Sequence, residues 1–205
     1  DDTTVAAILD DARFAPSGGN RQPWRVAVLH DRAVRRDLAT LMQPIWDEYI
    51  VATRAGHVPF NAVDYRPVHG APHIPNPLLD AIETVPVVLA VAADLRRIVA
   101  ADGDLGRATV VPGASIYPFC WNVLLAARER GLGGVLTTFL SRAEPQAAPL
   151  LRLPDGYALA ATIFVGHPVR QPTNLRRNDV ASFASIDTFD GPPLQVGVGP
   201  DRPVI

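Results

Sequence analysis

Two nearly continuous apolar runs constrain the fold of this chain most: VPVVLAVAA at 85–93 and YALAATIFV at 157–165. Each run has the length of a β-strand and almost no polar side, which is typical of a strand buried on both faces. Two further strands are predicted at 24–30 and 132–138. Helical patterns separate the strands, so the simplest architecture is a central sheet with helices on both faces.

Apolar residues at helical spacing predict helices over 3–13, 31–50 and 116–130. Asp2 or Thr3 is expected to cap the first helix. Pro44 is expected to kink or split the second, because a proline inside a helix removes one backbone hydrogen bond. Pro118 suits the first turn of the third helix, and Gly131 suits the left-handed position just after its end.

A fourth, shorter helix is predicted to end at Leu151, opened by a capping box of Ser141 and Glu144. Residues 59–77 are rich in proline and lack periodicity, so we expect a lid or insert over about 44–77. Residues 168–205 have little apolar core, and we expect this C-terminal tail to wrap a partner subunit. The whole chain, 1–205, is predicted to be a single domain.

Composition excludes several classes of protein. The formal net charge of -2 gives no sign of nucleic-acid binding, and no apolar run reaches the length of a membrane span. The opening residues predict no secretory signal. Cys120 is the single cysteine, which excludes an intrachain disulfide and fits a reducing, cytoplasmic location.

The segment APSGGNRQPW at 15–24 has the composition of a ligand-binding loop. Its glycines allow close backbone approach to a ligand. Its hydroxyl and amide groups both donate and accept hydrogen bonds, and Trp24 offers a flat apolar wall. The alternative is an ordinary connection in which Ser17 and Asn20 serve as turn residues.

This segment closely resembles the flavin-contacting loop of the nitroreductase family, FMN-dependent oxidoreductases that take hydride from NAD(P)H. The resemblance implies an α+β fold of three layers (α/β/α), with a mixed, largely antiparallel sheet. It also implies that FMN is contacted by the loop residues Pro16, Ser17, Gly18, Asn20 and Gln22.

A second segment, Asn122 to Thr138, resembles the part of the same family in which a long helix ends in a GLG turn and leads into a strand. The resemblance implies that Leu136, Thr137 and Thr138 lie along the isoalloxazine ring. A main-chain N–H near flavin N5 and O4 tunes electron affinity without adding a titratable group.

A third segment carries the order LPxG, VGxP and then a basic pair, which is also similar to the family. The resemblance implies that Arg177, with Arg176 second, binds the FMN phosphate, since arginine can hold a phosphate with two charge-assisted hydrogen bonds. The family's arginine-rich motif ahead of the first helix is expected to precede residue 1. Residues 192–205 extend past the usual family terminus and receive no assignment.

Other candidate residues carry less weight. His69 and His73 do not suit a metal site, because Gly70 and Pro72 oppose a helix there and no carboxylate has ligand spacing. No dinucleotide-binding glycine fingerprint follows a strand. Cys120 is interpreted as a core residue. Four residues are candidates for lining a substrate pocket or for plain packing: Tyr49, His57, Tyr65 and Tyr117.

The resemblance therefore predicts a homodimer with FMN bound and NAD(P)H as a transient co-substrate. The acceptor is a small aromatic or conjugated molecule: a nitroaromatic, a quinone or an activated alkene. No side-chain acid or base is expected to be obligatory, because the flavin carries the chemistry. The alternatives are reductive dehalogenation or flavin breakdown on the same fold, a non-catalytic flavin-binding protein, and a dimeric interaction protein without cofactor.

Overall fold

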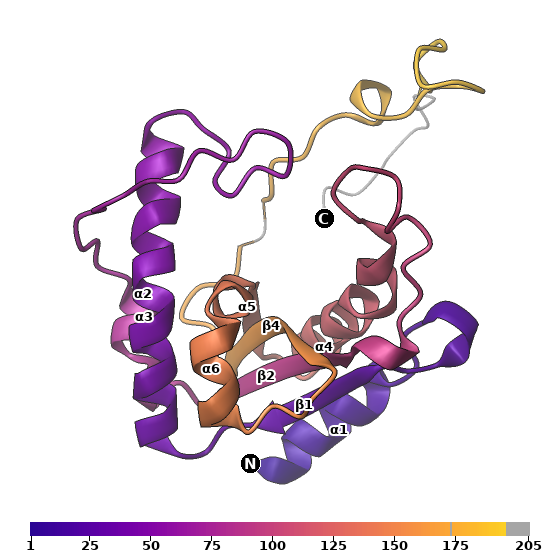
Figure 1. Ribbon diagram of the computed structural model, residues 1–205. Coiled ribbons are helices and arrows are strands. Elements are labelled where there is room, and N and C mark those ends of the chain that lie inside the picture. The colour runs from indigo at the N-terminus through magenta and orange to yellow at the C-terminus, as the bar shows by residue number, and fades with distance from the viewer. Residues whose placement is uncertain (173, 196–205) are drawn as a thin grey trace. The chain divides into compact units, whose positions relative to one another are not determined.

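The computed structural model describes residues 1–172 and 174–195. The chain divides into two units, Asp1–Pro168 and Val169–Ile205, which are described separately. The first unit contains six α-helices and four strands (Figure 1). The described part of the second unit contains a short 3-10 turn at Val180–Ser182 and an isolated bridge between Ser185 and Pro193.

The elements of the first unit follow the alternation that the sequence predicts. In chain order they are α1 (Asp2–Ala12), β1 (Trp24–Val28), α2 (Arg32–Arg54), α3 (Pro77–Asp80), β2 (Val87–Asp94), α4 (Tyr117–Glu129), β3 (Gly133–Thr137), α5 (Phe139–Arg142), α6 (Glu144–Leu151) and β4 (Tyr157–Gly166).

The four strands form one sheet in the order β1-β2-β4-β3, and all three pairings are antiparallel. The two apolar runs, β2 and β4, occupy the centre, and β1 and β3 form the edges. A register shift between Val91 and Ala92 leaves Ala160 of β4 outside the ladder. The predicted three-layer α+β architecture is confirmed, with each described pairing antiparallel.

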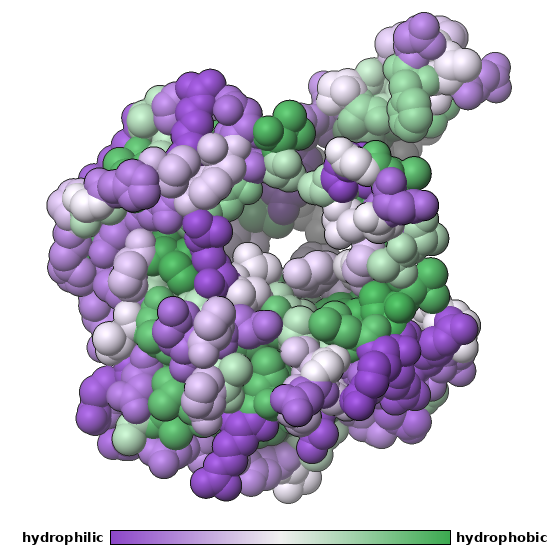
Figure 2. Space-filling view, in the orientation of Figure 1, coloured by the Kyte–Doolittle hydropathy of each residue, from purple (hydrophilic) through white to green (hydrophobic). Residues whose placement is uncertain are grey.

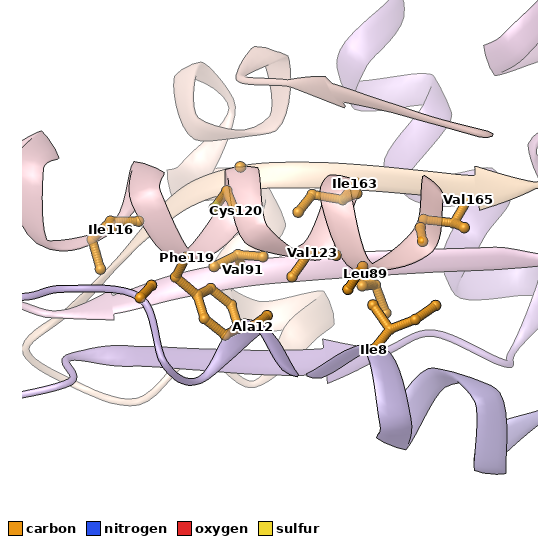
Figure 3. Close-up of a cluster of buried hydrophobic side chains, with 14 of the residues drawn as sticks. Ile8, Ala12, Leu89, Val91, Ile116, Phe119, Cys120, Val123, Ile163 and Val165 are labelled. Atoms are coloured by element: carbon orange, nitrogen blue, oxygen red, sulfur yellow. The ribbon is translucent and has the colours of Figure 1, made fainter. Parts of the chain in front are cut away.

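One face of the sheet is covered by α1 and α4 (Figure 3). Leu89 and Val91 of β2 meet Ile8 of α1 and Val123 of α4 in this layer, and all four side chains are buried. The end of α4 matches its prediction, because Pro118 lies in the first turn and Gly131 follows the helix with φ of +72°.

The opposite face is covered by α2, α5 and α6. Val88 and Ala90, the alternate residues of β2, meet Leu38 of α2 and Leu140 of α5. Because β2 buries both of its faces, a continuous apolar run is what this strand requires.

Three local predictions are wrong, in whole or in part. Asp1, rather than Asp2 or Thr3, caps α1 by accepting from the Thr4 N–H. Pro44 does not split α2, which runs unbroken to Arg54 (Figure 1), so of the two expected effects only a kink stays a prediction. The carbonyl that loses its partner belongs to Thr40, which is exposed to water, while buried residues on both sides of Pro44 hold the helix to the sheet.

The predicted capping box is also absent. Ser141 lies inside α5, and its hydroxyl is buried without a partner among the described residues. The Glu144 carboxylate instead accepts a hydrogen bond from the backbone N–H of Leu159 in β4. Tertiary packing therefore uses a carboxylate that the local pattern assigns to a cap.

Candidate functional site

The loop before β1 has an unusual backbone. Gly18–Asn20 form a 3-10 turn, and φ is positive at Gly19 (+60°), Asn20 (+51°) and Gln22 (+48°). A Cβ at Gly19 would also lie 2.5 Å from the Arg21 guanidinium, whereas one at Gly18 would meet its nearest neighbour at 3.4 Å. The backbone therefore requires glycine at position 19 more than at position 18. The sequence interpretation considered both glycines but placed only Gly18 among the FMN contacts.

Side chains of this loop hydrogen-bond within the loop. The Ser17 hydroxyl accepts from the Gln22 N–H at 2.9 Å, and the Gln22 amide donates to the Asn20 side-chain oxygen at 3.1 Å. The Gly18 N–H donates to the buried hydroxyl of Ser115 at 3.1 Å. Among the described residues, the hydroxyl hydrogen of Ser17 and the amide nitrogen of Asn20 have no acceptor and are available for a ligand. The loop's own hydrogen bonds fix its conformation without a ligand.

Trp24 anchors the loop to the core. Its ring stacks on Phe119 of α4, with centroids 4.8 Å apart and an interplanar angle of 8°. Phe119 is buried in the layer between α4 and the sheet. One face of the indole is thus occupied by protein, so Trp24 acts as an anchor where the sequence suggested a ligand wall.

The second predicted segment lies on the edge strand β3. Leu136 and Thr137 are half-buried, and Thr138 is exposed. The ladder with β4 ends at the pair Thr137 and Thr162, and both hydroxyls are buried without a partner in the described residues. A Cβ at Gly134 would lie 2.7 Å from the Leu124 side chain, so this glycine permits α4 to pack on the strand.

The first loop lies at one end of the sheet, and β3 runs toward that end but stops short of it: Thr137 pairs with Thr162, which pairs with Ala90, three residues before Ala93 along β2. Trp24, the first residue of β1, pairs with Ala93 near the end of β2. Because β3 and β2 are both antiparallel to β4, β3 ends in the same direction as β2. Three strand spacings, about 14 Å, separate the two edges.

A polar and aromatic cluster lies one helical turn beyond Thr138. Arg142, the last residue of α5, places its guanidinium 4.6 Å from the ring centroid of Phe60 and 5.0 Å from that of Tyr65. It also donates to the Tyr65 hydroxyl, which in turn donates to Glu48 of α2 at 2.6 Å. The Glu48 carboxylate holds the pKa of Tyr65 above its usual value, chiefly through this hydrogen bond.

A second set of rings adjoins this cluster along α2. Tyr49 and Trp46 stack with centroids 6.3 Å apart, and the Phe139 ring meets both edge-on. The sequence named Tyr49 and Tyr65 as possible pocket residues but gave no indication of Glu48, Phe60 or Arg142. The contact between Tyr65 and Arg142 joins residues 77 positions apart, and no local sequence pattern could reveal it.

The remaining candidate pocket residues lie elsewhere. The Tyr117 hydroxyl donates to the carbonyl of Ala160 at 3.3 Å, and burial raises the pKa of Tyr117. His57 is exposed. Within residues 1–172 and 174–195, no group of three or more His, Cys, Asp or Glu side chains is placed to hold a metal ion. Cys120 is buried, and desolvation raises its pKa to about 12.

The predicted phosphate ligands Arg176 and Arg177 lie in the second unit. Arg177 donates to the carbonyl of Arg176 at 2.7 Å. It lines a cavity of about 530 Å³ within that unit, together with Asp179. Because the two units are described separately, phosphate binding by this pair stays a prediction, as does the wrapping of a partner by the tail.

Comparison with known proteins gives consistent results. The family model described as "Nitroreductase family" matches residues 1–167. The chain is 30% identical over 171 residues to 5,6-dimethylbenzimidazole synthase of Rhodospirillum rubrum, which covers 82% of this chain and 72% of that protein.

Solved structures share the fold at lower identity. NfrA2 of B. megaterium superposes with a TM-score of 0.64 at 18% identity, over 93% of this chain and 67% of that one. The NADPH:FMN oxidoreductase of Vibrio harveyi, complexed with NAD+, gives 0.59 at 19% identity, over 89% of this chain and 66% of that one. In the described residues, no helix combines the length and hydropathy that a membrane crossing requires.

Proposed function

The chain belongs to the nitroreductase family, and from that premise we propose that it is an FMN-dependent oxidoreductase. It takes hydride from NAD(P)H and reduces a nitroaromatic, a quinone or an activated alkene in two successive half-reactions. One observation carries the proposal: within the described residues the Ser17 hydroxyl and the Asn20 amide nitrogen donate to no other group, and their loop lies at the end of the sheet toward which β3 runs.

The residues present fit FMN in their chemistry. The ribityl hydroxyls and the ring edge of a flavin both donate and accept hydrogen bonds, as do the side chains of Ser17, Asn20 and Gln22. The buried hydroxyl of Thr137 has no hydrogen-bond partner among the described residues and lies in the segment expected along the ring. The proposed phosphate ligands, Arg176 and Arg177, would add charge-assisted hydrogen bonds.

Each part of the chain has a separate task in this proposal. When bound, FMN supplies a carrier that receives hydride at N5 and passes electrons to an acceptor. Ser17 and Asn20 bind the cofactor and fix its orientation, because their loop is held by Ser115 and Trp24. Backbone groups from Leu136 to Thr138 stabilise the ring without a titratable side chain.

We expect two copies of the chain to form a dimer through α4. Three large side chains at i, i+4 and i+8 of this helix are exposed: Tyr117 (44%), Trp121 (60%) and Leu125 (49%). Figure 2 shows apolar side chains gathered over this part of the first unit. An apolar stripe of this kind marks an interaction surface.

A second candidate follows from the relative in Rhodospirillum rubrum, a 5,6-dimethylbenzimidazole synthase. The dimethylated benzene ring of that product also occurs in the flavin isoalloxazine. The alternative of flavin breakdown therefore keeps the same cofactor and site, and differs in whether the flavin survives turnover.

The test begins with the purified protein. We expect a flavin absorption spectrum and, after heat release, FMN by chromatography. Under anaerobic conditions NADPH or NADH should bleach the visible band, and 4-nitrotoluene should restore it. A colourless protein that does not bind added FMN would overturn the proposal. Loss of flavin with formation of a dimethylbenzimidazole in air would favour the second candidate.

A further inference from the structure

Arg142 carries a positive charge that no carboxylate neutralises directly. Among the described residues it forms no ion pair within 4.0 Å. Its single side-chain hydrogen bond goes to the neutral hydroxyl of Tyr65. A guanidinium has five N–H donors, and because Arg142 is exposed, most of its donors face solvent and are accessible to an anionic ligand.

The nearby acids are engaged elsewhere. Glu48 accepts from the Tyr65 hydroxyl, and Asp47 is buried and accepts from Gln43 and the Ile74 N–H. Asp64, in the loop that carries Tyr65, pairs with Arg66 at 2.6 Å. Neither Asp47 nor Asp64 contacts Arg142, and Glu48 reaches it only through the Tyr65 hydroxyl.

The predicted lid begins later than expected, because α2 continues to Arg54 and only residues 55–76 form the loop that is called the lid below. This lid holds its rings against Arg142 with a strained backbone. Phe60 has φ of +52°, a conformation that is rare for a bulky side chain and costs free energy. The next residue, Asn61, fixes the turn by accepting from the backbone N–H groups of Val63 and Asp64. A strained backbone of this kind persists only where the surrounding contacts fix the conformation, and such residues cluster at ligand-binding sites.

We propose that Arg142 determines specificity for an anionic group on the aromatic electron acceptor. The inference rests on the proposed function and names its substrate class: a planar aromatic acceptor that bears a carboxylate. Arginine binds a carboxylate through two parallel N–H donors, and its flat face stays on the rings of Phe60 and Tyr65. The acceptor ring then lies toward Thr138, four residues before Arg142 along the chain.

The structure also allows a simpler role, in which Arg142 only fastens the lid to α5. The two roles predict different kinetics. If Arg142 only fastens the lid, replacing it lowers kcat/KM for all acceptors alike. If Arg142 determines specificity, replacing it lowers kcat/KM for the carboxylate-bearing acceptor alone.

The kinetic experiment compares 4-nitrobenzoate with the neutral 4-nitrotoluene as acceptors. For Arg142→Gln we expect a loss of about 10- to 100-fold in kcat/KM for 4-nitrobenzoate, because a hydrogen bond to a charged group is removed. The neutral acceptor should change by less than about threefold. Arg142→Lys should recover part of the loss, since lysine keeps the charge without the planar fork.

Arg32→Gln is the matched control, because Arg32 is an exposed residue at the opposite end of α2 from the lid. It removes the same charge and should leave the ratio between the two acceptors unchanged. An equal loss of kcat/KM for both acceptors in Arg142→Gln would overturn the inference. A fall in the 4-nitrobenzoate to 4-nitrotoluene ratio that is as large in Arg32→Gln as in Arg142→Gln would overturn it as well.

Equilibrium binding of 4-nitrobenzoate, measured by calorimetry with and without FMN, separates this inference from the proposed function. Binding that weakens in Arg142→Gln supports the anion site even if NAD(P)H does not reduce the flavin. Binding that is unchanged in Arg142→Gln overturns the anion site even if the flavin is bound and reduced.

Discussion

The first loop and the lid cluster (Glu48, Phe60, Tyr65 and Arg142) both hold polar side chains in place by hydrogen bonds, but they draw those side chains from different parts of the chain. In the first loop, Ser17, Asn20 and Gln22 bond to one another within six consecutive residues. In the lid cluster, Glu48, Tyr65 and Arg142 come from α2, the lid and α5. The comparison teaches that a loop proposed to bind a cofactor can be encoded in a short motif, whereas the cluster proposed to select the substrate depends on how the whole unit folds.

The first prediction breaks the anchor of the loop. Trp24→Ala removes the half-buried ring that stacks on Phe119 and should destabilise the protein by about 2–4 kcal/mol. Urea unfolding measures the change. Phe14→Ala, at a side chain that is 73% exposed, should change stability by less than about 0.5 kcal/mol. Equal effects would mean that the stacking does not anchor the loop.

The second prediction concerns the cofactor. Asn20→Ala removes an amide that donates and accepts, and leaves a buried ligand hydroxyl unpaired at a cost of about 1–3 kcal/mol. We expect FMN affinity to fall roughly five- to 150-fold, measured by fluorescence titration. Unchanged FMN affinity would mean that the loop is a plain connector. The comparison between a cofactor-binding loop and the lid cluster would then fail.

The third prediction tests which glycine the loop requires. Gly19→Ala forces a side chain onto φ of +60° and should cost about 1–2 kcal/mol. The clash with Arg21 adds little, because the far end of a flexible side chain can move. Gly18→Ala, whose Cβ would meet Ser115 at 3.4 Å, is the matched control and should cost less. A larger cost at Gly18 would contradict the observed backbone.

The fourth prediction is the smallest and concerns the lid. Tyr65→Phe removes the hydroxyl between Glu48 and Arg142 but keeps the ring against the guanidinium. Hydrogen exchange of the amides of Val63 and Asp64 should rise about two- to tenfold, as the loss of one hydrogen bond allows. Exchange in the first loop should not change, because no contact of Tyr65 in the described residues reaches it. A rise in both regions would remove the distinction between them.

The layered fold could be predicted because its determinants are continuous in sequence. β2 and β4 are apolar throughout, and Pro118 and Gly131 mark the ends of α4 by their own backbone restrictions. Pro44 misled for the opposite reason, because buried contacts on both sides of it outweigh one lost hydrogen bond. Local rules fail where tertiary packing supplies the larger free energy.

The candidate site was predictable only in its local half. The motif at 15–24 identified the first loop, but not which of its two glycines has the positive φ or that Ser115 holds Gly18. The lid cluster could not be predicted from the sequence, because residue spacing shows neither the contact of Arg142 with Phe60 nor the positive φ at Phe60.

A crossed titration of Asn20→Ala and Arg142→Gln with FMN and 4-nitrobenzoate tests the central claim most directly. We expect Asn20→Ala to weaken FMN binding and to leave the preference for 4-nitrobenzoate over 4-nitrotoluene intact. Arg142→Gln should abolish that preference and leave FMN affinity unchanged. If the protein binds no FMN, or if either substitution shifts both quantities together, the division between a cofactor loop and a substrate-selecting lid is contradicted.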